Sequence, residues 1–153
     1  MLQYGKIGLH LDAHSRGSMT IGNAMESLVS GQQLQSPLGG TTISFFGPAY
    51  SAQEASNILN NLSGNVSSTV KLQNHAADFV GSWIGLNSGT WGSIPKESNT
   101  IMQWINIFRD GVPTTHSCYG SMKPGCQGDY GTPVTKDINA KKNNFDYAKI
   151  ANP

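Results

Sequence analysis

The sequence predicts an α/β protein with a small, mostly parallel sheet and flanking helices. Its 153 residues correspond to about one domain. Strand-like and helix-like segments alternate along residues 1–111, a pattern typical of parallel strands joined by helices. Glycine or proline separates most of these segments. We therefore expect a single domain over 1–153, with an α/β core over 1–111, a cysteine-containing loop region over 112–140 and a polar tail over 141–153.

The first two elements are a strand and a helix joined by a tight turn. Ile7, Leu9 and Leu11 alternate with other residues, which predicts a strand with one apolar side. The turn has Ser15 at its apex. Apolar residues at helical spacing then follow over Met19–Ser30, and the next glycine ends the predicted helix.

The next elements repeat the order of strand and helix. Thr41–Phe46 is β-branched and aromatic, which predicts a second strand. Ser51 and Glu54 form a capping box, which opens a helix that ends at Gly64. Thr69–Gln73 predicts a third and shorter strand.

The rest of the chain carries one further predicted element. Residues 74–81 are interpreted as a turn region, and the Gly-, Ser- and Asn-rich residues 85–100 as a surface loop. An amphipathic helix is predicted near 101–111 from its apolar residues Ile101, Trp104, Ile105 and Phe108. No periodicity follows from Val112 onward, so the predicted sheet has only three strands.

Composition and charge narrow the classes of function. Charged residues make up 12% of the chain and the net charge is +1, which argues against general nucleic-acid binding. The composition is typical of an exported or surface-associated bacterial protein, so we expect a secreted or cell-surface location. No apolar run reaches membrane-spanning length. Strand-like sequence begins almost at once, so we expect no signal peptide and a fragment of a longer protein.

The two cysteines, Cys118 and Cys126, enclose a short loop with glycine and proline. We predict a disulfide between them, which would pin this loop. The alternative is a pair of reduced thiols in a cytosolic protein. Two cysteines without nearby paired ligands do not indicate a zinc site, and we expect no metal or cofactor.

Ala13–Gly17 (AHSRG) has the spacing of a nucleophile elbow, the strand–turn–helix segment that presents a catalytic serine. Such a turn is sharp, so the residues two before and two after the serine must be small, as Ala13 and Gly17 are. The alternative interpretation is an ordinary turn in which Ser15 is only a helix N-cap.

Asp78 and His116 follow Ser15 in the chain order of an α/β-hydrolase triad: nucleophile, acid, histidine. Each falls at a strand end or in a loop, where open α/β sheets build their sites. His116 would take the proton of Ser15, and Asp78 would hold the imidazole in the right tautomer. The backbone N–H of Arg16 would be one oxyanion donor.

Three segments resemble successive blocks of lipase-like α/β-hydrolases: the elbow at Ala13–Gly17, the strand end at Ile43–Ala49 (ISFFGPA) and the acid segment at Asn74–Val80 (NHAADFV). The resemblance covers residues 5–85 and then His116. It implies a truncated α/β-hydrolase-like fold and an ester or lipid-like small substrate.

The chain is also similar to the C-terminal regions of bacterial filamentous haemagglutinin and CdiA-type contact-dependent inhibition exoproteins. Asp78–Gly81 (DFVG) and Val112–Gly120 (VPTTHSCYG) carry this second resemblance. It implies a toxin or effector module delivered into a target cell. Its expected partners are an immunity protein or the rest of a large exoprotein.

Two departures from the hydrolase pattern lower the expected activity. No strands precede the elbow, so the loop that supplies the second oxyanion donor is missing. Loss of one such donor costs on the order of 10²–10³ in rate. The second departure is Ala13, where the usual elbow has glycine.

The other histidines and the rival acid have structural interpretations. His10 is expected to be structural, His14 to pack or hydrogen-bond, and His75 to be a loop histidine. Asp12 precedes the nucleophile on the same strand, where it reaches His116 poorly. Arg16 is expected to be solvated, and the three tryptophans to anchor core and loops: Trp83, Trp91 and Trp104.

Three functions therefore compete. The first is a serine esterase or lipase-like hydrolase. The second is a nuclease-type toxin that uses His14, His75 or His116 as acid and base, which the near-neutral charge disfavours. The third is a degenerate, non-catalytic hydrolase-fold module for delivery or interaction, which the missing oxyanion loop favours.

Overall fold

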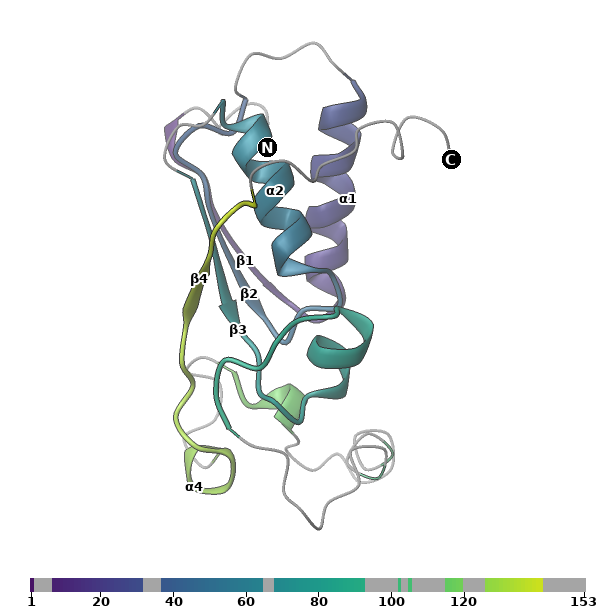
Figure 1. The fold of residues 1–153 in the computed structure, drawn as a ribbon, viewed down its shortest axis with the longest axis vertical. Coiled ribbons are helices and arrows are strands. Elements are labelled where there is room, and N and C mark those ends of the chain that lie inside the picture. The colour runs from purple at the N-terminus through teal and green to yellow at the C-terminus, as the bar shows by residue number, and fades with distance from the viewer. Residues whose placement is uncertain are drawn as a thin grey trace.

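The protein is built on one open sheet of four strands (Figure 1). The computed structural model describes residues 1, 7–31, 37–64, 68–92, 102, 105, 115–119 and 126–141. The strands β1 (His10–His14), β2 (Thr42–Phe46) and β3 (Thr69–Gln73) are parallel and pair in chain order. The short β4 (Lys136–Ile138) joins the edge of β3 in the antiparallel direction. The predicted mostly parallel sheet with flanking helices is confirmed.

Two helices, α1 (Arg16–Ser30) and α2 (Ala52–Leu62), cover the same face of the sheet (Figure 1). Each helix connects two neighbouring parallel strands, which is the crossover connection that parallel pairing requires. The alternating apolar residues of the strands point at these helices and form the core with them. The largest fully buried apolar side chains of this core are Met25, Leu38, Ile43, Phe45, Ile58, Leu59 and Val70.

The opposite face of the sheet is polar. Along β1, His10 and Asp12 are exposed, and the Nε2 atom of His10 lies 3.1 Å from Oδ1 of Asp12. On the neighbouring strands the same face carries Ser44 and Lys71, in register with Asp12. The described chain therefore buries one face of the sheet only, which explains why its strands alternate between apolar and polar residues.

The second helix and the third strand form where the sequence predicts them. The Ser51 hydroxyl accepts a hydrogen bond from the Glu54 N–H at 3.2 Å, as an N-cap should. The four residues of the expected apolar face are buried: Ala55, Ile58, Leu59 and Leu62. Gly64 ends the helix with a φ of +64°, a conformation that glycine adopts without steric cost.

The first strand lies later in the chain than predicted. Ile7 is 81% exposed, and β1 begins only at His10. Gly8 has a φ of +92°, so the chain turns there instead of continuing an extended strand. The inward side of β1 is therefore formed by Leu11 and Ala13, with Leu9 half-buried just before the strand, and only the expected inward position of Ile7 is wrong.

The predicted count of three strands is also wrong. The sequence of β4 contains no hydrophobic run from which a strand could be predicted, and two of its three residues are exposed. Its place is fixed by tertiary contacts: the Ser56 hydroxyl donates to the Ile138 carbonyl at 2.7 Å, and Gln53 Nε2 donates to the Asn139 carbonyl at 2.9 Å. A short edge strand of this kind ends a sheet without offering a long pairing edge.

Two parts of the sequence analysis fall outside the described residues. In the helix predicted over 101–111, only Met102 and Ile105 are described, and both are helical and exposed. The polar tail is described only at Lys141. Among the described helices, none has the length and apolar character that crossing a membrane requires.

Two glycines of α1 provide a matched test of the packing. An added Cβ at Gly22 would lie 2.5 Å from Tyr50 Cδ2, whereas one at Gly17 would lie 3.6 Å from the Ala13 Cβ, an ordinary contact. We expect Gly22→Ala to lower the free energy of unfolding by about 1–3 kcal/mol, the usual cost of overpacking. Gly17→Ala should leave it unchanged or slightly higher. Urea unfolding measures both, and equal effects of the two variants would contradict this packing.

Candidate functional site

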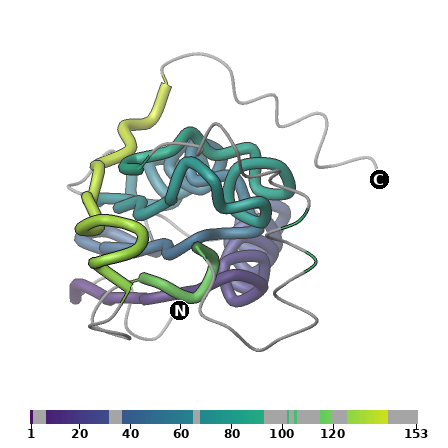
Figure 2. Tube along the Cα trace, turned by 90° about the horizontal axis from the view of Figure 1, so that it is seen from below, coloured from purple at the N-terminus to yellow at the C-terminus, as the bar shows by residue number. Residues whose placement is uncertain are grey.

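The candidate site lies beyond the carboxyl ends of the parallel strands. In Figure 1 the segments that follow β3, the short helical turn η3 (Thr115–Ser117) and helix α4 (Cys126–Tyr130) gather at this end of the sheet. Figure 2 views the molecule from this end and shows the green tube that contains η3 over the strand ends. Parallel strands bring the residues that follow them to one edge, which is where ligands bind in open α/β sheets.

Ser15 occupies the sharp turn between β1 and α1. Its φ of 51° and ψ of −124° lie outside the regions that non-glycine residues favour. Its N–H donates to the Phe46 carbonyl at 3.2 Å, and its own carbonyl accepts from the Ser18 hydroxyl at 2.6 Å and the Ala49 N–H at 3.3 Å. These bonds hold a backbone conformation that costs about 1–3 kcal/mol. The tight turn predicted at this serine is present.

Asp78 is a fully buried carboxylate with several donors. Its Oδ1 accepts the backbone N–H groups of Val80 at 2.9 Å and Gly81 at 3.2 Å. Its Oδ2 accepts the hydroxyl of Tyr119. Burial alone would raise the pKa of the Asp78 carboxyl. The hydrogen bond and charge of His116, together with the other donors, outweigh burial and hold this pKa below its usual value.

His116 faces this carboxylate. Its Nδ1 lies 3.0 Å from both Oδ1 and Oδ2 of Asp78. Since a carboxylate only accepts hydrogen bonds, Nδ1 carries a proton here. The imidazole is largely buried, with 12% of its side chain exposed. Nε2 is the ring nitrogen that remains for a proton transfer, and it is bonded to no described residue.

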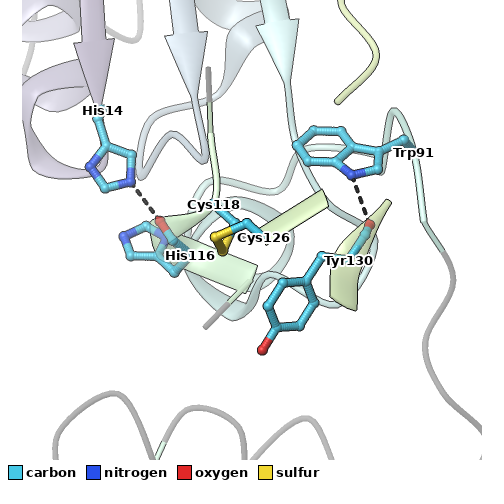
Figure 3. Close-up of a disulfide and its surroundings, with 6 residues drawn as sticks. All are labelled: His14, Trp91, His116, Cys118, Cys126 and Tyr130. Carbon is cyan, nitrogen blue, oxygen red and sulfur yellow. Dashed lines mark hydrogen bonds between the residues drawn. A yellow bond between two sulfur atoms is a disulfide. The ribbon is translucent and has the colours of Figure 1, made fainter. Parts of the chain in front are cut away.

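The structure brings Asp78 and His116 together, but it does not join the Ser15 hydroxyl to them by a hydrogen bond. Within the described residues, the Ser15 side chain bonds to none. The connection runs through its neighbour His14, whose Nε2 donates to the His116 carbonyl at 2.7 Å (Figure 3). The two imidazole rings lie 4.7 Å apart. The turn of the serine and the loop of the histidine are therefore in direct contact.

The surroundings of His14 favour the neutral form of its imidazole. Burial lowers the pKa of its imidazole below the usual value, although the His116 carbonyl partly opposes this effect. The expected packing and hydrogen-bonding role of His14 agrees with these contacts.

Two contributors to this arrangement were not identified from the sequence. Tyr119 is 1% exposed and holds the acid. Gly47 directly follows β2 with a φ of +49°, and a Cβ there would lie 2.5 Å from Asp78 Oδ2 and 2.6 Å from the Tyr119 ring. The Phe-Gly-Pro turn was visible as a strand end, but nothing local showed that its glycine makes room for a buried carboxylate.

The predicted disulfide between Cys118 and Cys126 is confirmed, with a Cα–Cα distance of 5.6 Å. It joins the chain just after His116 to the start of α4 (Figure 3). The other end of α4 is bound to the core, because Trp91 Nε1 donates to the Tyr130 carbonyl at 3.2 Å. The loop that carries the histidine is thus braced without a long regular element.

His75 proves to be a buried structural residue, so its interpretation as a loop histidine without a role needs correction. Its Nδ1 accepts the Ala77 N–H at 3.1 Å. Its ring meets Trp91 and Tyr130 edge to face, at centroid distances of 5.5 and 5.9 Å. Burial lowers the pKa of this imidazole, with an opposing contribution from the charge of Asp78. This ring packs behind the acid.

A π-helical turn, η2 (Val80–Ile84), begins within the segment 74–81, for which the sequence predicts only a turn region. The Asn87 side chain holds this turn in place: its Nδ2 donates to the Gly81 and Gly85 carbonyls, and its Oδ1 accepts the Ala52 N–H at 2.8 Å. Trp83 on this turn is 68% exposed, so its expected role as an anchor is wrong. Trp91 does anchor a loop, and Trp104 lies outside the described residues.

The remaining candidates lie away from the paired acid and histidine. Asp12 and His10 pair with each other on the open face of the sheet, so Asp12 is not the partner of His116. Arg16 is exposed at the first position of α1, as expected for a solvated side chain. In the described part of the chain, no group of three or more His, Cys, Asp or Glu side chains is arranged to hold a metal ion.

Comparison with protein-family models, with curated proteins and with solved structures finds no significant match to this chain.

The buried histidines predict a loss of stability in mild acid. The pKa of His75 is lowered in the folded protein, so between that pKa and about 6.5 the unfolded chain binds a proton that the folded chain does not. Stability is therefore complete above pH 6.5 and falls as the pH drops through the folded pKa, and His14 adds a contribution of the same sign. Thermal unfolding at a series of pH values measures this, and His75→Gln should flatten the dependence. An unchanged slope in that variant would contradict it.

The disulfide predicts a redox-dependent stability. Its two cysteines are eight positions apart, so opening the bond frees a short loop in the unfolded state and costs about 2–3 kcal/mol. Urea unfolding with and without reductant measures this difference, and Cys118→Ala/Cys126→Ala should match the reduced protein. Two free thiols in the mass spectrum of the unreduced protein would contradict the bond.

Proposed function

We propose that the protein is a serine hydrolase that cleaves ester bonds, with Ser15 as nucleophile, His116 as base and Asp78 as the acid that orients it. The observation that carries the proposal is the hydrogen-bonded pair of Asp78 and His116, which lies at the same sheet edge as a serine with a positive φ. A histidine with a buried carboxylate on one ring nitrogen has the other nitrogen available as a base.

In the proposed ester hydrolysis, each of the three residues has its own role. His116 Nε2 takes the hydroxyl proton of Ser15 as the oxygen attacks the ester carbonyl, and then gives the proton to the leaving alcohol, so that the acyl group stays on Ser15. Water, deprotonated by the same Nε2, then attacks the acyl-serine, releases the carboxylic acid and restores the Ser15 hydroxyl. Asp78 keeps Nδ1 protonated and stabilises the imidazolium that forms. The Ser15 hydroxyl must come within hydrogen-bond reach of Nε2 for this transfer. Such bonds are often loose without substrate and tighten when it binds.

The oxyanion of the tetrahedral intermediate would meet the start of α1. The first N–H groups of a helix have no acceptor within the helix, and the helix dipole favours negative charge there. The N–H of Arg16, the first residue of α1, is therefore the proposed donor. With one donor of the usual pair, we expect a rate lower by on the order of 10²–10³ than that of a complete site.

Exposed apolar side chains on the segment that follows the acid support an ester with an apolar acyl group as the substrate class. Trp83, Ile84 and Leu86 follow Asp78 within eight residues, and all three are exposed. Leu86 is 81% exposed and also has a positive φ of 53°, so the backbone is strained where this side chain is presented to solvent. Exposed apolar patches of this kind are typical of binding surfaces.

The proposed setting is a secreted or surface-exposed bacterial exoprotein, with this chain as an effector or toxin module. A disulfide is stable in such oxidising compartments and rare in the cytosol, which supports the setting. The resemblance of Val112–Gly120 to contact-dependent inhibition proteins adds to it.

The decisive experiment compares Ser15→Ala with Ser27→Ala. Alanine at position 15 removes the attacking oxygen but fits the turn, so we expect loss of short-chain ester hydrolysis and of labelling by a fluorophosphonate probe. Ser27 lies on the exposed side of α1, where its hydroxyl donates to the Asn23 carbonyl, so its variant should keep both. Thermal unfolding confirms that both variants fold.

Equal hydrolysis by wild type and Ser15→Ala would reject the serine mechanism. Absence of both hydrolysis and labelling in wild type would favour the non-catalytic module instead. Cleavage of nucleic acid by wild type, lost in His116→Ala, would favour the nuclease-type toxin.

A further inference from the structure

Tyr119 is the side chain that completes the surroundings of the buried acid. Its hydroxyl donates to Asp78 Oδ2 and accepts the N–H of His75 at 3.2 Å. A phenol has one proton to donate and lone pairs to accept, so both contacts are made at once. The tyrosine comes directly after Cys118, in the segment that also carries His116. One short segment therefore supplies both side chains that bind the acid.

The two oxygens of Asp78 are held differently. Oδ1 accepts the backbone N–H groups of Val80 and Gly81, and His116 Nδ1 is 3.0 Å from it as from Oδ2. On Oδ2, the Tyr119 hydroxyl is the donor besides His116 Nδ1. Without the hydroxyl, Oδ2 would keep only the His116 imidazole as a donor, and rotation of the carboxylate about the Cβ–Cγ bond would be less restricted.

The protonation state of Tyr119 suits this role. Burial, together with the charge of Asp78 and the hydrogen bond to it, raises the pKa of the phenol well above its usual value. The hydroxyl therefore remains a donor throughout the pH range in which a serine hydrolase works. The groups that face it are the carboxylate of Asp78, the N–H of His75, and the rings of His14, His116 and Trp91.

We propose that Tyr119 is a positioning residue of the site: its hydroxyl fixes the plane of the Asp78 carboxylate and thereby the orientation of the His116 ring. The inference rests on the proposed serine hydrolase function. The proposed functional unit then comprises four side chains: Ser15 next to His116, His116 next to Asp78, and Asp78 next to Tyr119.

The test replaces the hydroxyl alone, with Tyr119→Phe. We expect kcat for ester hydrolysis to fall by roughly tenfold or more, the equivalent of one hydrogen bond to a charged group. KM should not change, because Tyr119 is buried behind the acid and does not reach the substrate. Asp78→Asn provides the coupling test: if Tyr119 acts through Asp78, adding Tyr119→Phe to that variant should lower kcat no further.

Tyr50→Phe is the matched control. The Tyr50 hydroxyl also donates to a carboxylate, that of Glu26, but between α1 and the chain leading to α2, without contact to Asp78 or His116. Each variant loses one tyrosine–carboxylate hydrogen bond, buried for Tyr119 and partly buried for Tyr50, and both should lower the unfolding temperature. Only Tyr119→Phe should lower kcat. Equal kcat in wild type and Tyr119→Phe would overturn the proposal.

A proton NMR measurement separates this inference from the proposed function, because it requires no turnover. The Nδ1 proton of His116, donated to a buried carboxylate, should resonate far downfield in wild type. The signal should shift or broaden in Tyr119→Phe and stay in place in Tyr50→Phe. If wild type shows no Ser15-dependent hydrolysis, the proposed function fails, yet a shift in this signal still supports positioning by Tyr119. An unmoved signal rejects it.

A second measurement uses wild type alone and holds even if Tyr119→Phe does not fold. The hydroxyl proton of Tyr119 and the Nδ1 proton of His116 both point at Asp78, so a nuclear Overhauser contact should join them. Its absence would overturn the proposal.

Discussion

The structure beyond the sheet depends on one constraint, the buried negative charge of Asp78. An ionised carboxylate without water is costly unless hydrogen bonds replace its hydration. Here the replacement comes from two backbone N–H groups, an imidazole and a phenol. The first two come from the turn that follows β3, and the last two come from a segment about 40 positions further along. The acid therefore fixes how these two distant segments meet, and removal of either partner leaves a charge that the interior cannot solvate.

The same constraint explains features that are otherwise unrelated. Gly47 lacks a side chain because the carboxylate and the Tyr119 ring occupy that space. The disulfide next to Tyr119 limits the freedom of a segment that has only a single helical turn of its own. Asn87 binds the turn that presents the backbone donors. The disulfide lowers the conformational entropy that its segment loses on folding, whereas the other two devices act through space and hydrogen bonds. A binding or catalytic site needs such support, because its side chains must hold one geometry.

The sequence predicts the elements with local signals and misses those that tertiary contacts create. α2 and β3 follow from a capping box and from β-branched residues, and both form where expected. β4 is polar and exists because β3 offers it an edge. The pairing of Asp78 with His116 follows from chain order and strand ends, whereas Tyr119 lies in a stretch rich in Gly, Pro and Cys without periodicity. Its contact with the acid spans 41 positions, and no local pattern encodes it.

Two features at one edge of the sheet are not explained by folding stability: the strained backbone of Ser15 and the buried charge of Asp78. A non-glycine residue with φ near 50° is unfavourable, and a fold that needed only a turn would place glycine there. Ser15 holds this conformation between β1 and α1, with a hydroxyl that no described residue uses. Its neighbour His14 contacts the loop of His116, so the strained serine and the buried acid are two ends of one connected structure. Stability alone requires neither, and the proposed transfer of a proton from Ser15 to His116 would use both.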